Sequence, residues 1–390
     1  MTGCARPCPL CGHPASRPLR PLRYELFDDT ALSGASPLVA CAGCGMVYNR
    51  PDGGPHALLA YYRANDHYAT SQTPGSGGES EGERRRYRRL FDCLGLGKGD
   101  AVRTVLDVGC GKGGWLEWLY RAGSSQLIGI EASDACRESI QCRGLVDVYP
   151  GVADVPDDAG ADLVVLSHVL EHLYDPLAEL RMLVEKSADD ARFFIEVPNA
   201  LAMLESVLPW SWLFFEHINH FTERSLRTLA QRAGLEVSRS GQWSFDPDHG
   251  AKCECLYLVC RARGGTDKRP ASIDDDWWRA LDVRLPARPL AAAQVAEMLS
   301  TSGRLALWGC SQYAMLIMGM HEEIRARLAM LFDASPAKIG RRVAGMEIRS
   351  PAELTCLTDD DLLLLPRSGY LDGMSRHLRD AGIKGRSRVV

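Results

Sequence analysis

The sequence predicts an α/β protein that has a Rossmann-like parallel sheet, a small N-terminal metal-binding unit and a second, C-terminal Rossmann-like domain. Two Cys-x-x-Cys turns near the start of the chain indicate the metal-binding unit. Apolar strands alternate with amphipathic helices between the polar stretches at 71–83 and 263–276, as in a parallel α/β sheet. A further strand–helix series at 305–366 predicts the second sheet.

Length and composition allow this organisation and exclude several classes of protein. With 390 residues, 46% hydrophobic and 24% charged, the chain can form two or three globular domains. We assign three units, at residues 1–60, 85–262 and 277–390. A net charge of −5 gives no reason to expect nucleic acid or an anionic membrane as partner. No apolar stretch is long enough to span a bilayer and the N-terminus lacks a signal-peptide layout, so we expect a cytoplasmic protein.

The first unit carries two cysteine turns, CPLCG at 8–12 and CAGCG at 41–45. Fourteen cysteines in a cytoplasmic chain favour metal ligands or buried thiols over disulfides. Gly12 and Gly45 permit the left-handed backbone of a metal-binding turn. Four thiolates form a closed tetrahedral Zn²⁺ site, which is structural rather than catalytic. The predicted ligands are Cys8, Cys11, Cys41 and Cys44; the alternative is a set of free or redox-active thiols.

The basic run at 84–86, continued by Arg88 and Arg89, opens the second unit. Because charged runs are usually solvated, we predict an exposed helix face there.

A glycine turn follows the first strand of the second unit. VLDV at 105–108 is predicted to be a buried strand, GCGKGG at 109–114 the turn, and a helix begins at 115. Gly109, Gly111 and Gly113 would let backbone N–H groups contact a nucleoside ligand. LIGIE at 127–131 is a second strand, and its terminal Glu131 is placed to bind ribose hydroxyls.

The segment DVGCGKGG resembles motif I of the class I S-adenosylmethionine (SAM)-dependent methyltransferases. Segments at 161–176, 192–199 and 215–237 are similar to later motifs of the same family. The resemblance implies a class I methyltransferase sheet that binds SAM over residues 85–262. It also implies that the glycine turn lies beside the methionine part of SAM, and that Asp107 fixes the loop and the SAM amino group.

The segments on either side of the methyltransferase-like region indicate which branch of the family the chain resembles. The cysteine unit, YYRANDHY at 61–68 and the C-terminal segment at 332–354 together look like the sugar C-methyltransferases of deoxysugar biosynthesis. Those enzymes methylate C3 of a nucleotide-linked 4-keto-deoxysugar. The resemblance therefore implies a natural-product biosynthetic enzyme whose small-molecule substrate is a nucleotide sugar or a related intermediate.

Two alternatives of function stay open. One is an O- or N-methyltransferase of another small metabolite. The other, from a different class, is a zinc-containing protein that binds or modifies nucleic acid, gripping RNA with the basic residues of the cysteine unit: Arg6, Arg17, Arg20 and Arg23.

Carbon methylation needs a base that removes a proton next to a carbonyl group. His217, beside Glu216 in FEHINHF, matches the Glu-His pair that the resemblance makes the base region. His172 follows the fourth strand, where such sheets place catalytic groups, and is the next candidate. The alternatives are a histidine that closes the SAM pocket and, for His172, a structural histidine at a helix start paired with Glu171.

Five further residues are weaker candidates for a role in the site. Tyr61, Tyr62 and Tyr68 could form a substrate lid or simply pack the cysteine unit on the core. His220 could cap the next helix. Asp333 ends the second strand of the C-terminal unit, the position of a ribose-binding acid, but that unit lacks G-x-G-x-x-G. We therefore expect no second cofactor there, and the unit either holds substrate or is a structural and dimer element.

Overall fold

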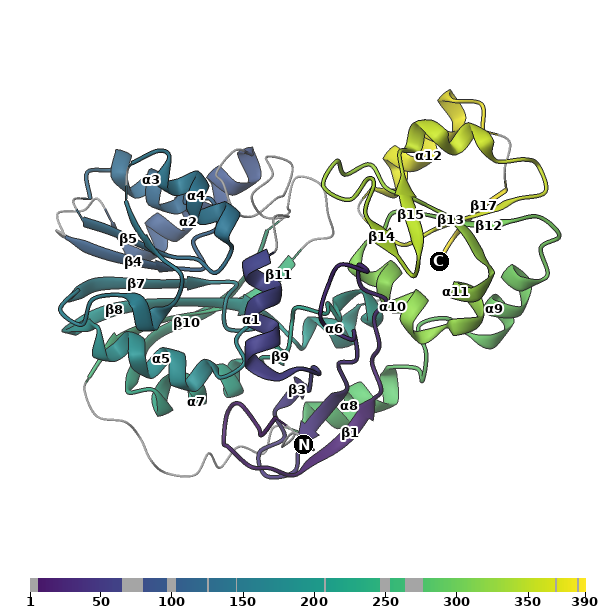
Figure 1. Cartoon of the computed structure of the whole chain (residues 1–390). Coiled ribbons are helices and arrows are strands. Elements are labelled where there is room, and N and C mark those ends of the chain that lie inside the picture. Colours follow the sequence, from purple (N-terminus) through teal and green to yellow (C-terminus); the bar gives the residue numbers. More distant parts are fainter. Residues whose placement is uncertain are drawn as a thin grey trace.

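The strands of the computed structural model form three sheets, and the largest is built from the middle of the chain (Figure 1). The structure describes residues 6–64, 80–96, 103–124, 126–144, 146–206, 208–245, 253–263, 276–368, 370–383 and 386–390. Most of both polar stretches expected to divide the units, at 71–83 and 263–276, lies outside these residues, as does Tyr68.

The central sheet has seven strands in the order β10-β11-β8-β7-β4-β5-β6. Strands β8 to β6 are parallel, and β11 runs antiparallel to both β8 and β10. The carboxyl ends of β4, β5, β7 and β8 therefore meet at one edge, where β11 begins. The bounds are β4 (Thr104–Val108), β5 (Gln126–Ile130), β6 (Asp147–Tyr149), β7 (Ala161–Ser167), β8 (Ser187–Pro198), β10 (Leu235–Phe245) and β11 (Cys253–Ala262).

Both faces of this sheet are buried. Val105 joins the core on one face, whereas Leu106 and Val108 join the core on the other, as the two-residue period of a strand requires. The elements that connect or flank the strands are α2 (Glu81–Leu94), α3 (Gly114–Arg121), α4 (Asp134–Gln141), η2 (Val152–Asp154), α5 (Pro176–Glu185), α6 (Ala202–Glu205), η3 (Pro209–Trp212) and α7 (Glu223–Arg232). Side chains fix several helix starts: Ser133 caps α4, Asp175 caps α5 and Thr222 caps α7.

The N-terminal sheet contains a strand from far along the chain. Its order is β1 (Ser16–Arg20), β2 (Leu38–Cys41), β3 (Val47–Asn49) and β9 (Asn219–His220). Helix α1 (Gly54–Ala64) follows β3. Because β9 belongs to the loop between β8 and α7, this pairing fastens the N-terminal unit to the segment that carries the central sheet.

The C-terminal sheet has the order β14-β15-β13-β12-β16-β17, and its last five strands are parallel. Its strands are β12 (Leu305–Trp308), β13 (Leu328–Phe332), β14 (Arg342–Val343), β15 (Met346–Arg349), β16 (Leu362–Leu365) and β17 (Arg386–Val389). Its helices are α8 (Trp277–Arg284), α9 (Ala292–Leu299), α10 (Gln312–Met320), α11 (Glu322–Arg327), η4 (Pro351–Cys356) and α12 (Leu371–Asp380). The predicted fold class is confirmed: the protein is α/β, with a Rossmann-like parallel sheet, a cysteine cluster near the N-terminus and a second α/β sheet at the C-terminus.

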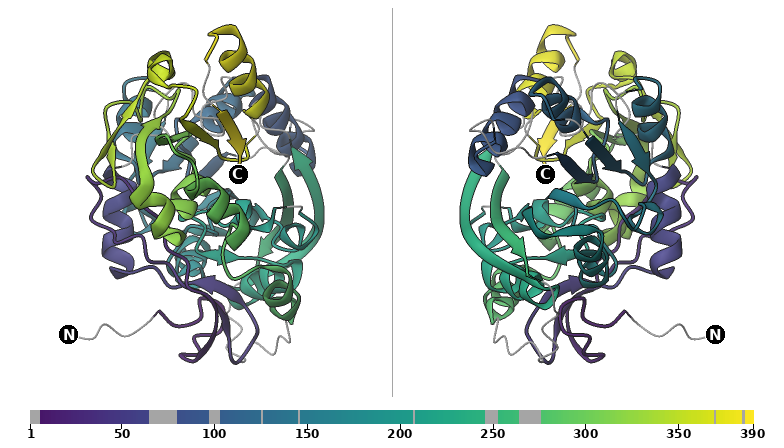
Figure 2. Two further views of the ribbon diagram at one scale, coloured as in Figure 1. Left: turned by 90° about the vertical axis from the view of Figure 1, so that its right-hand side faces the viewer. Right: turned by 90° about the vertical axis from the view of Figure 1, so that its left-hand side faces the viewer.

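The N-terminal unit lies between the two larger sheets (Figure 1). Strand β2 alternates between two cores: Leu38 and Ala40 pack with the C-terminal unit, and Val39 and Cys41 pack with the central sheet. A Cβ on Gly319 of α10 would lie 2.2 Å from the Arg23 carbonyl oxygen, so α10 approaches the N-terminal backbone very closely. In both views of Figure 2 the purple N-terminal strands and the yellow helix α12 lie at opposite ends of the molecule.

Within the described part of the chain, no helix has both the length and the apolar character needed to cross a membrane.

Candidate functional site

The four cysteines of the two N-terminal turns come together. Their sulfur atoms all lie within 4.8 Å of one another, with 3.6 Å between Cys8 and Cys44 and 3.5 Å between Cys11 and Cys41. Gly12 and Gly45 have φ of 75° and 78°, the left-handed backbone expected after each turn. Tetrahedral Zn–S bonds of about 2.3 Å separate sulfurs by about 3.8 Å. The donor set and its spacing therefore fit a zinc ion.

The glycine turn at 109–113 needs glycine for two reasons: its backbone has positive φ angles, and there is no room for a Cβ at position 109. Gly109, Gly111 and Gly113 have φ of 67°, 54° and 77°, which L-residues with a Cβ rarely adopt. A Cβ on Gly109 would also lie 2.6 Å from Cγ2 of Val169. The Gly109 N–H donates to the Ile130 carbonyl oxygen at 2.7 Å, which ties the turn to the end of β5. Glycine is thus required here before any ligand is considered.

Glu131, the residue after β5, holds this turn through its carboxylate. Oε2 accepts the Gly111 N–H and Oε1 accepts the Ser133 N–H, each at 2.8 Å. Burial raises the pKa of Glu131, whereas the two N–H donors oppose that shift. A carboxylate has about four acceptor positions, so these two bonds leave capacity for hydroxyl donors such as those of a ribose.

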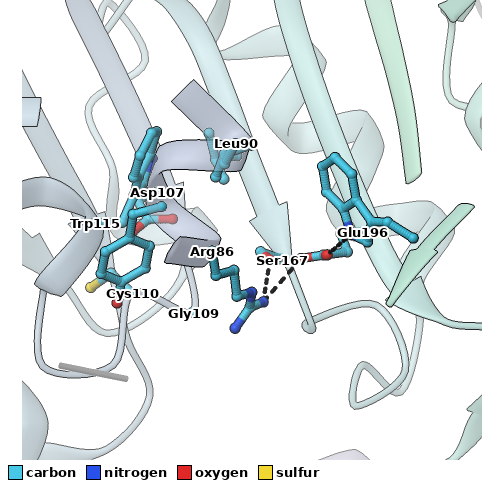
Figure 3. A pocket seen from close by; sticks show the side chains of 11 residues that line it. Arg86, Leu90, Asp107, Gly109, Cys110, Trp115, Ser167 and Glu196 are labelled. Atoms are coloured by element: carbon cyan, nitrogen blue, oxygen red, sulfur yellow. Dashed lines mark hydrogen bonds and ion pairs between the residues drawn. The ribbon is translucent and has the colours of Figure 1, made fainter. Parts of the chain in front are cut away.

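Asp107 lies inside β4 and lines a pocket (Figure 3). Burial raises the pKa of Asp107 to about 8, with Arg86 lowering it and Glu131 raising it further. The pocket is lined by Arg86, Tyr87, Leu90, Asp107, Gly109, Cys110, Trp115, Val165, Ser167, Glu196 and Trp243. Two predicted cofactor residues, Asp107 and Gly109, therefore face one hollow at the carboxyl edge of the sheet.

Arg86 corrects the expectation that the whole basic run is solvated. Its neighbours in the run are exposed, but Arg86 points into the pocket and pairs with Glu196 at 3.0 Å (Figure 3). It also donates to Ser167. Although burial opposes ionisation of Glu196, Arg86 and the surrounding donors lower its pKa to about 2.

A signal for this orientation exists in the sequence. The buried stripe of α2 consists of Glu83, Tyr87, Leu90 and Leu94. Arg86 stands three residues after Glu83 and four before Leu90, so it borders this stripe. The helical period, rather than the charge of the run, separates Arg86 from its exposed neighbours.

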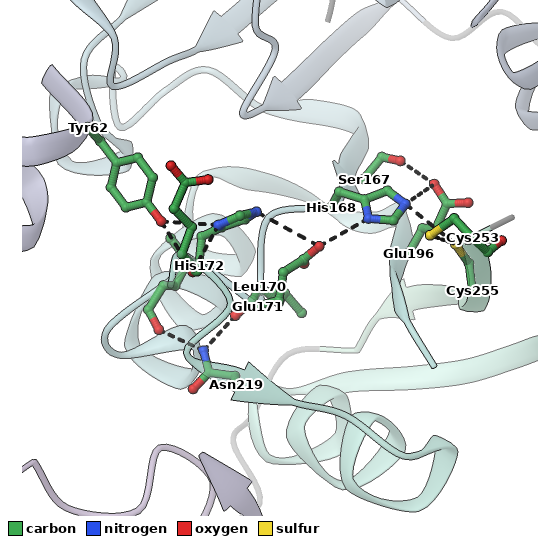
Figure 4. Close-up of polar contacts among 12 residues, drawn as sticks. Tyr62, Ser167, His168, Leu170, Glu171, His172, Glu196, Asn219, Cys253 and Cys255 are labelled. Atoms are coloured by element: carbon green, nitrogen blue, oxygen red, sulfur yellow. Dashed lines mark hydrogen bonds and ion pairs between the residues drawn. The ribbon is translucent and has the colours of Figure 1, made fainter. Parts of the chain in front are cut away.

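The predicted catalytic residues form a second group with two tyrosines of α1. Tyr61 donates to Glu216 Oε1 at 2.7 Å, and Tyr62 is hydrogen-bonded to His172 Nδ1 at 3.1 Å (Figure 4). His172 Nδ1 also lies 3.1 Å from the Glu216 carbonyl oxygen. Burial and then the Glu216 charge raise the pKa of Tyr61 far above its usual value, so its phenol stays protonated and donates. The tyrosines thus fasten the N-terminal unit to the Glu-His segment.

His217 lies beside His172, with ring centroids 4.9 Å apart. Burial, followed by repulsion from His172, lowers the pKa of His217 well below its usual value, so the ring is uncharged at neutral pH. No described residue hydrogen-bonds to its ring nitrogens. An uncharged imidazole with available nitrogen can accept a proton.

The predicted site residues therefore fall into two groups. The Figure 3 pocket includes Asp107 and Gly109 but not His172 or His217. Because His172 follows β7, which is parallel to β4 and adjacent to it, both groups stand at the carboxyl edge of the same sheet. His172 lies in the turn that precedes α5 and not at a helix start, but its Nε2 is 4.0 Å from Glu171 Oε1, the partner expected in the structural alternative.

Two weaker candidates have structural partners. His220 does not cap a helix: its Nε2 pairs with Asn49 Oδ1 at 2.9 Å, and burial lowers its pKa to about 4. Asp333 accepts the N–H groups of Cys310 and Ser335, each at 2.8 Å. In the C-terminal sheet it repeats what Glu131 does in the central sheet.

Comparison with known proteins identifies the segment that carries the central sheet. Residues 81–240 match the family model of a methyltransferase domain. No curated protein matches the chain.

Three solved structures illustrate the structural similarity. The N-methyltransferase NodS from Bradyrhizobium japonicum WM9, in complex with S-adenosyl-L-homocysteine, is 18% identical, with a TM-score of 0.39, and the match covers 53% of this chain and 97% of that one. Magnesium protoporphyrin IX methyltransferase (ChlM) from Synechocystis PCC 6803 is 17% identical, with a TM-score of 0.41, and the match covers 53% of this chain and 99% of that one. A chain from the complex of the Haloferax volcanii Trm112 methyltransferase activator with a methyltransferase is 17% identical, with a TM-score of 0.40. That match covers 47% of this chain and 92% of that one.

Proposed function

We propose that this protein is a SAM-dependent methyltransferase that methylates a carbon atom next to a carbonyl group in a nucleotide-linked keto-deoxysugar or a related biosynthetic intermediate. The single observation that supports SAM binding is the turn at 109–113 held by Glu131 inside a segment that matches a methyltransferase domain. The resemblance of the flanking segments to sugar C-methyltransferases supports the substrate class.

The residues at the carboxyl edge fit the binding of SAM. The positive φ of the turn brings bare backbone to the ligand, and Glu131 has acceptor capacity for the ribose hydroxyls. Asp107 in the neighbouring pocket would accept from the SAM amino group. Bound SAM supplies an electrophilic methyl group, so the protein has to position the acceptor and remove a proton.

His217 is the base in this proposal. Its uncharged ring would take the proton from the carbon next to the carbonyl group, which would leave that carbon able to attack the methyl group that SAM would supply. Tyr61 and Tyr62 hold the Glu-His segment and His172 in place from α1. His217 carries the proton until it passes to solvent.

The direct test is incubation with methyl-labelled SAM and a panel of keto-sugar nucleotides, read by mass spectrometry. The expected product is heavier by one labelled methyl group on carbon. Label found on oxygen or nitrogen of another metabolite instead would refute carbon methylation while retaining SAM dependence.

A variant tests the base separately. His217→Asn should lower turnover by roughly 10²–10⁴-fold, the usual effect of losing a general base, while SAM affinity stays near that of the wild type. With a non-reactive SAM analogue bound, the wild type should exchange the substrate α-proton with deuterated water and His217→Asn should not. His56→Asn, an exposed histidine on α1, is the control. Unimpaired exchange in His217→Asn would move the role of base to His172.

A further inference from the structure

Three metal-ligating side chains that belong to neither group above meet beside the Figure 3 pocket. His168 is the first residue after β7, and Cys253 and Cys255 lie at the start of β11. Because β11 runs antiparallel to β8, with Cys255 opposite Pro198, the start of β11 reaches the carboxyl edge of the sheet. The two-residue period of a strand places both cysteines on one face. Residues far apart in the sequence thus converge at one point (Figure 4).

Their spacing matches that of tetrahedral coordination. The Cys253 and Cys255 sulfurs are 3.5 Å apart, Cys255 Sγ is 3.5 Å from His168 Nε2, and all three atoms lie within 4.8 Å of one another. Bonds of about 2.3 Å to sulfur and 2.1 Å to nitrogen predict separations of about 3.8 Å and about 3.6 Å. The N-terminal cysteine cluster shows the same sulfur–sulfur spacing, 3.5–3.6 Å.

The imidazole of His168 is also oriented as a metal ligand. Its Nδ1 lies 3.1 Å from Oε1 of Glu171, whose side chain is 1% exposed. This carboxylate orients the ring so that Nε2 faces Cys255, and a carboxylate on the second ring nitrogen is found behind most metal-bound histidines. His168 itself has a φ of 59°, a backbone conformation that costs energy for a residue with a Cβ and is found most often at functional sites.

We propose that His168, Cys253 and Cys255 bind a second metal ion of the thiolate-preferring class, Zn²⁺ in the cell, with Glu171 as the positioning residue. Two thiolates and one imidazole are a donor set that Zn²⁺ prefers over Mg²⁺ or Ca²⁺. The proposal rests on these contacts and not on the proposed methyl transfer.

Among the described residues, three side chains supply ligands, and the fourth position of the tetrahedron is open in this proposal. A further carboxylate of the described part of the chain, Glu196, has Oε2 3.9 Å from His168 Nε2 and already accepts from Arg86, Ser167 and Trp243. An exchangeable water or a small thiol would fill the fourth position. In this respect the site differs from the closed four-cysteine site, because an open position is typical of catalytic zinc.

Metal content of the full-length protein tests the proposal. The wild type should contain two zinc equivalents per chain, and Cys253→Ser combined with Cys255→Ser should contain one. Cys260→Ser, on the same strand but outside the cluster, is the matched control and should retain two. An unchanged zinc content in the double variant, or a Cys253–Cys255 disulfide in the native protein, would overturn the proposal.

A second variant guards against misfolding of the double variant. Glu171→Gln removes no ligand, yet it should weaken zinc binding by 10–100-fold, the usual effect of losing such a partner. Competition with a chromogenic chelator measures this change, and circular dichroism verifies the fold. Cobalt-substituted protein should change its visible spectrum when 2-mercaptoethanol is added, because the open position accepts the thiol. A spectrum insensitive to the thiol, or wild-type zinc affinity in Glu171→Gln, would contradict the site as described.

Discussion

At the scale of single residues, three carboxylates stand at the carboxyl edge of the central sheet in different electrostatic settings, two of them buried and that of Glu131 half-buried. Glu131 accepts hydrogen bonds from two backbone N–H groups, and Glu196 forms an ion pair with Arg86. The attraction of Arg86 for Asp107 offsets only part of the effect of burial on the Asp107 carboxylate. Their pKa values diverge accordingly: that of Glu196 falls to about 2 and that of Asp107 rises to about 8. Such divergence is a property of binding and catalytic sites.

Asp107 should make stability depend on pH. Between its ordinary pKa of 3.8 and its folded value of about 8, the folded state binds more protons than the unfolded state, so stability falls as pH rises. Each pKa unit corresponds to about 1.4 kcal/mol. Asn at position 107 cannot ionise, so the stability of Asp107→Asn lacks this pH dependence. The difference in free energy of unfolding between Asp107→Asn and the wild type should therefore increase in favour of the variant from pH 5 to pH 8 and stay constant above that pH. The total increase should be about the cost of burying the charge.

Urea unfolding at intervals from pH 5 to pH 9 measures this difference. Asp372→Asn, an exposed residue of α12, is the control and should run parallel to the wild type. Parallel curves for Asp107→Asn as well would mean that Asp107 is not buried in a protonated form.

Glu131→Ala should weaken SAM binding by about 2–3 kcal/mol, the usual cost of losing a charged hydrogen-bond partner. Two effects add: the ribose loses an acceptor, and the Gly111 N–H loses the oxygen that holds the turn. Isothermal titration calorimetry measures the affinity, with the exposed Glu138→Ala of α4 for comparison. Unchanged affinity in Glu131→Ala would remove this residue from the SAM site.

At the scale of elements, the turn between β4 and α3 depends on close packing against the segment after β7. The Cβ of an alanine at 109 would meet Val169 at 2.6 Å, whereas one at Gly123, which also has a positive φ, would meet nothing within 4 Å. The two glycines therefore share the conformational requirement and differ in the steric one.

Gly109→Ala should destabilise the protein more than Gly123→Ala does. The conformational part is about 1–3 kcal/mol for each, and the contact with Val169 adds to it only at 109. Denaturant unfolding of both variants isolates the steric part. Adding Val169→Ala to Gly109→Ala should recover some of that loss; equal losses at 109 and 123, with no such recovery, would argue against the close approach.

Two helices, α2 and α1, place side chains at the site through contacts that the sequence motifs did not predict. Helix α2 turns one arginine of its basic run into the pocket, and α1 brings two tyrosines to the Glu-His segment. Arg6 of the N-terminal unit is likewise buried, donating to the carbonyls of Asn49 and Ile218. Its use inside the protein argues against the alternative in which it grips RNA.

At the scale of the whole molecule, the N-terminal unit connects the other two. Its sheet includes β9, one side of β2 packs with the central sheet, and the other side packs with the C-terminal unit. A metal that stabilises this unit would therefore also stabilise the positions of His172 and Glu216, which α1 contacts. It would not directly affect the glycine turn.

Cys41→Ser should remove the predicted zinc of the four-cysteine site and destabilise the N-terminal unit, because a closed metal site contributes folding free energy. We expect faster amide hydrogen exchange over residues 54–64 and lower turnover, with SAM affinity little changed. Elemental analysis and hydrogen-exchange mass spectrometry measure these effects, with the exposed Cys356→Ser as control. Full zinc content in Cys41→Ser, or fully titratable thiols in the native protein, would exclude the site.

The sequence by itself determined the features that depend on neighbours along the chain. The strand at 104–108, the glycine turn and the acid after the next strand follow from periods and spacings of a few residues, and so do the two cysteine turns. Local sterics and local hydrogen bonds impose these features, so a pattern of residue types is enough to predict them.

The tertiary structure alone decided which distant residues meet. The inward turn of Arg86, the pairing of β9 with β3 and the approach of His168 to Cys253 and Cys255 join segments separated by 85 or more residues. A lone histidine and an isolated Cys-x-Cys have no short-range pattern that marks them as partners. Their meeting depends on the order of strands in the sheet, which follows from burial of whole elements rather than from the residues that come together.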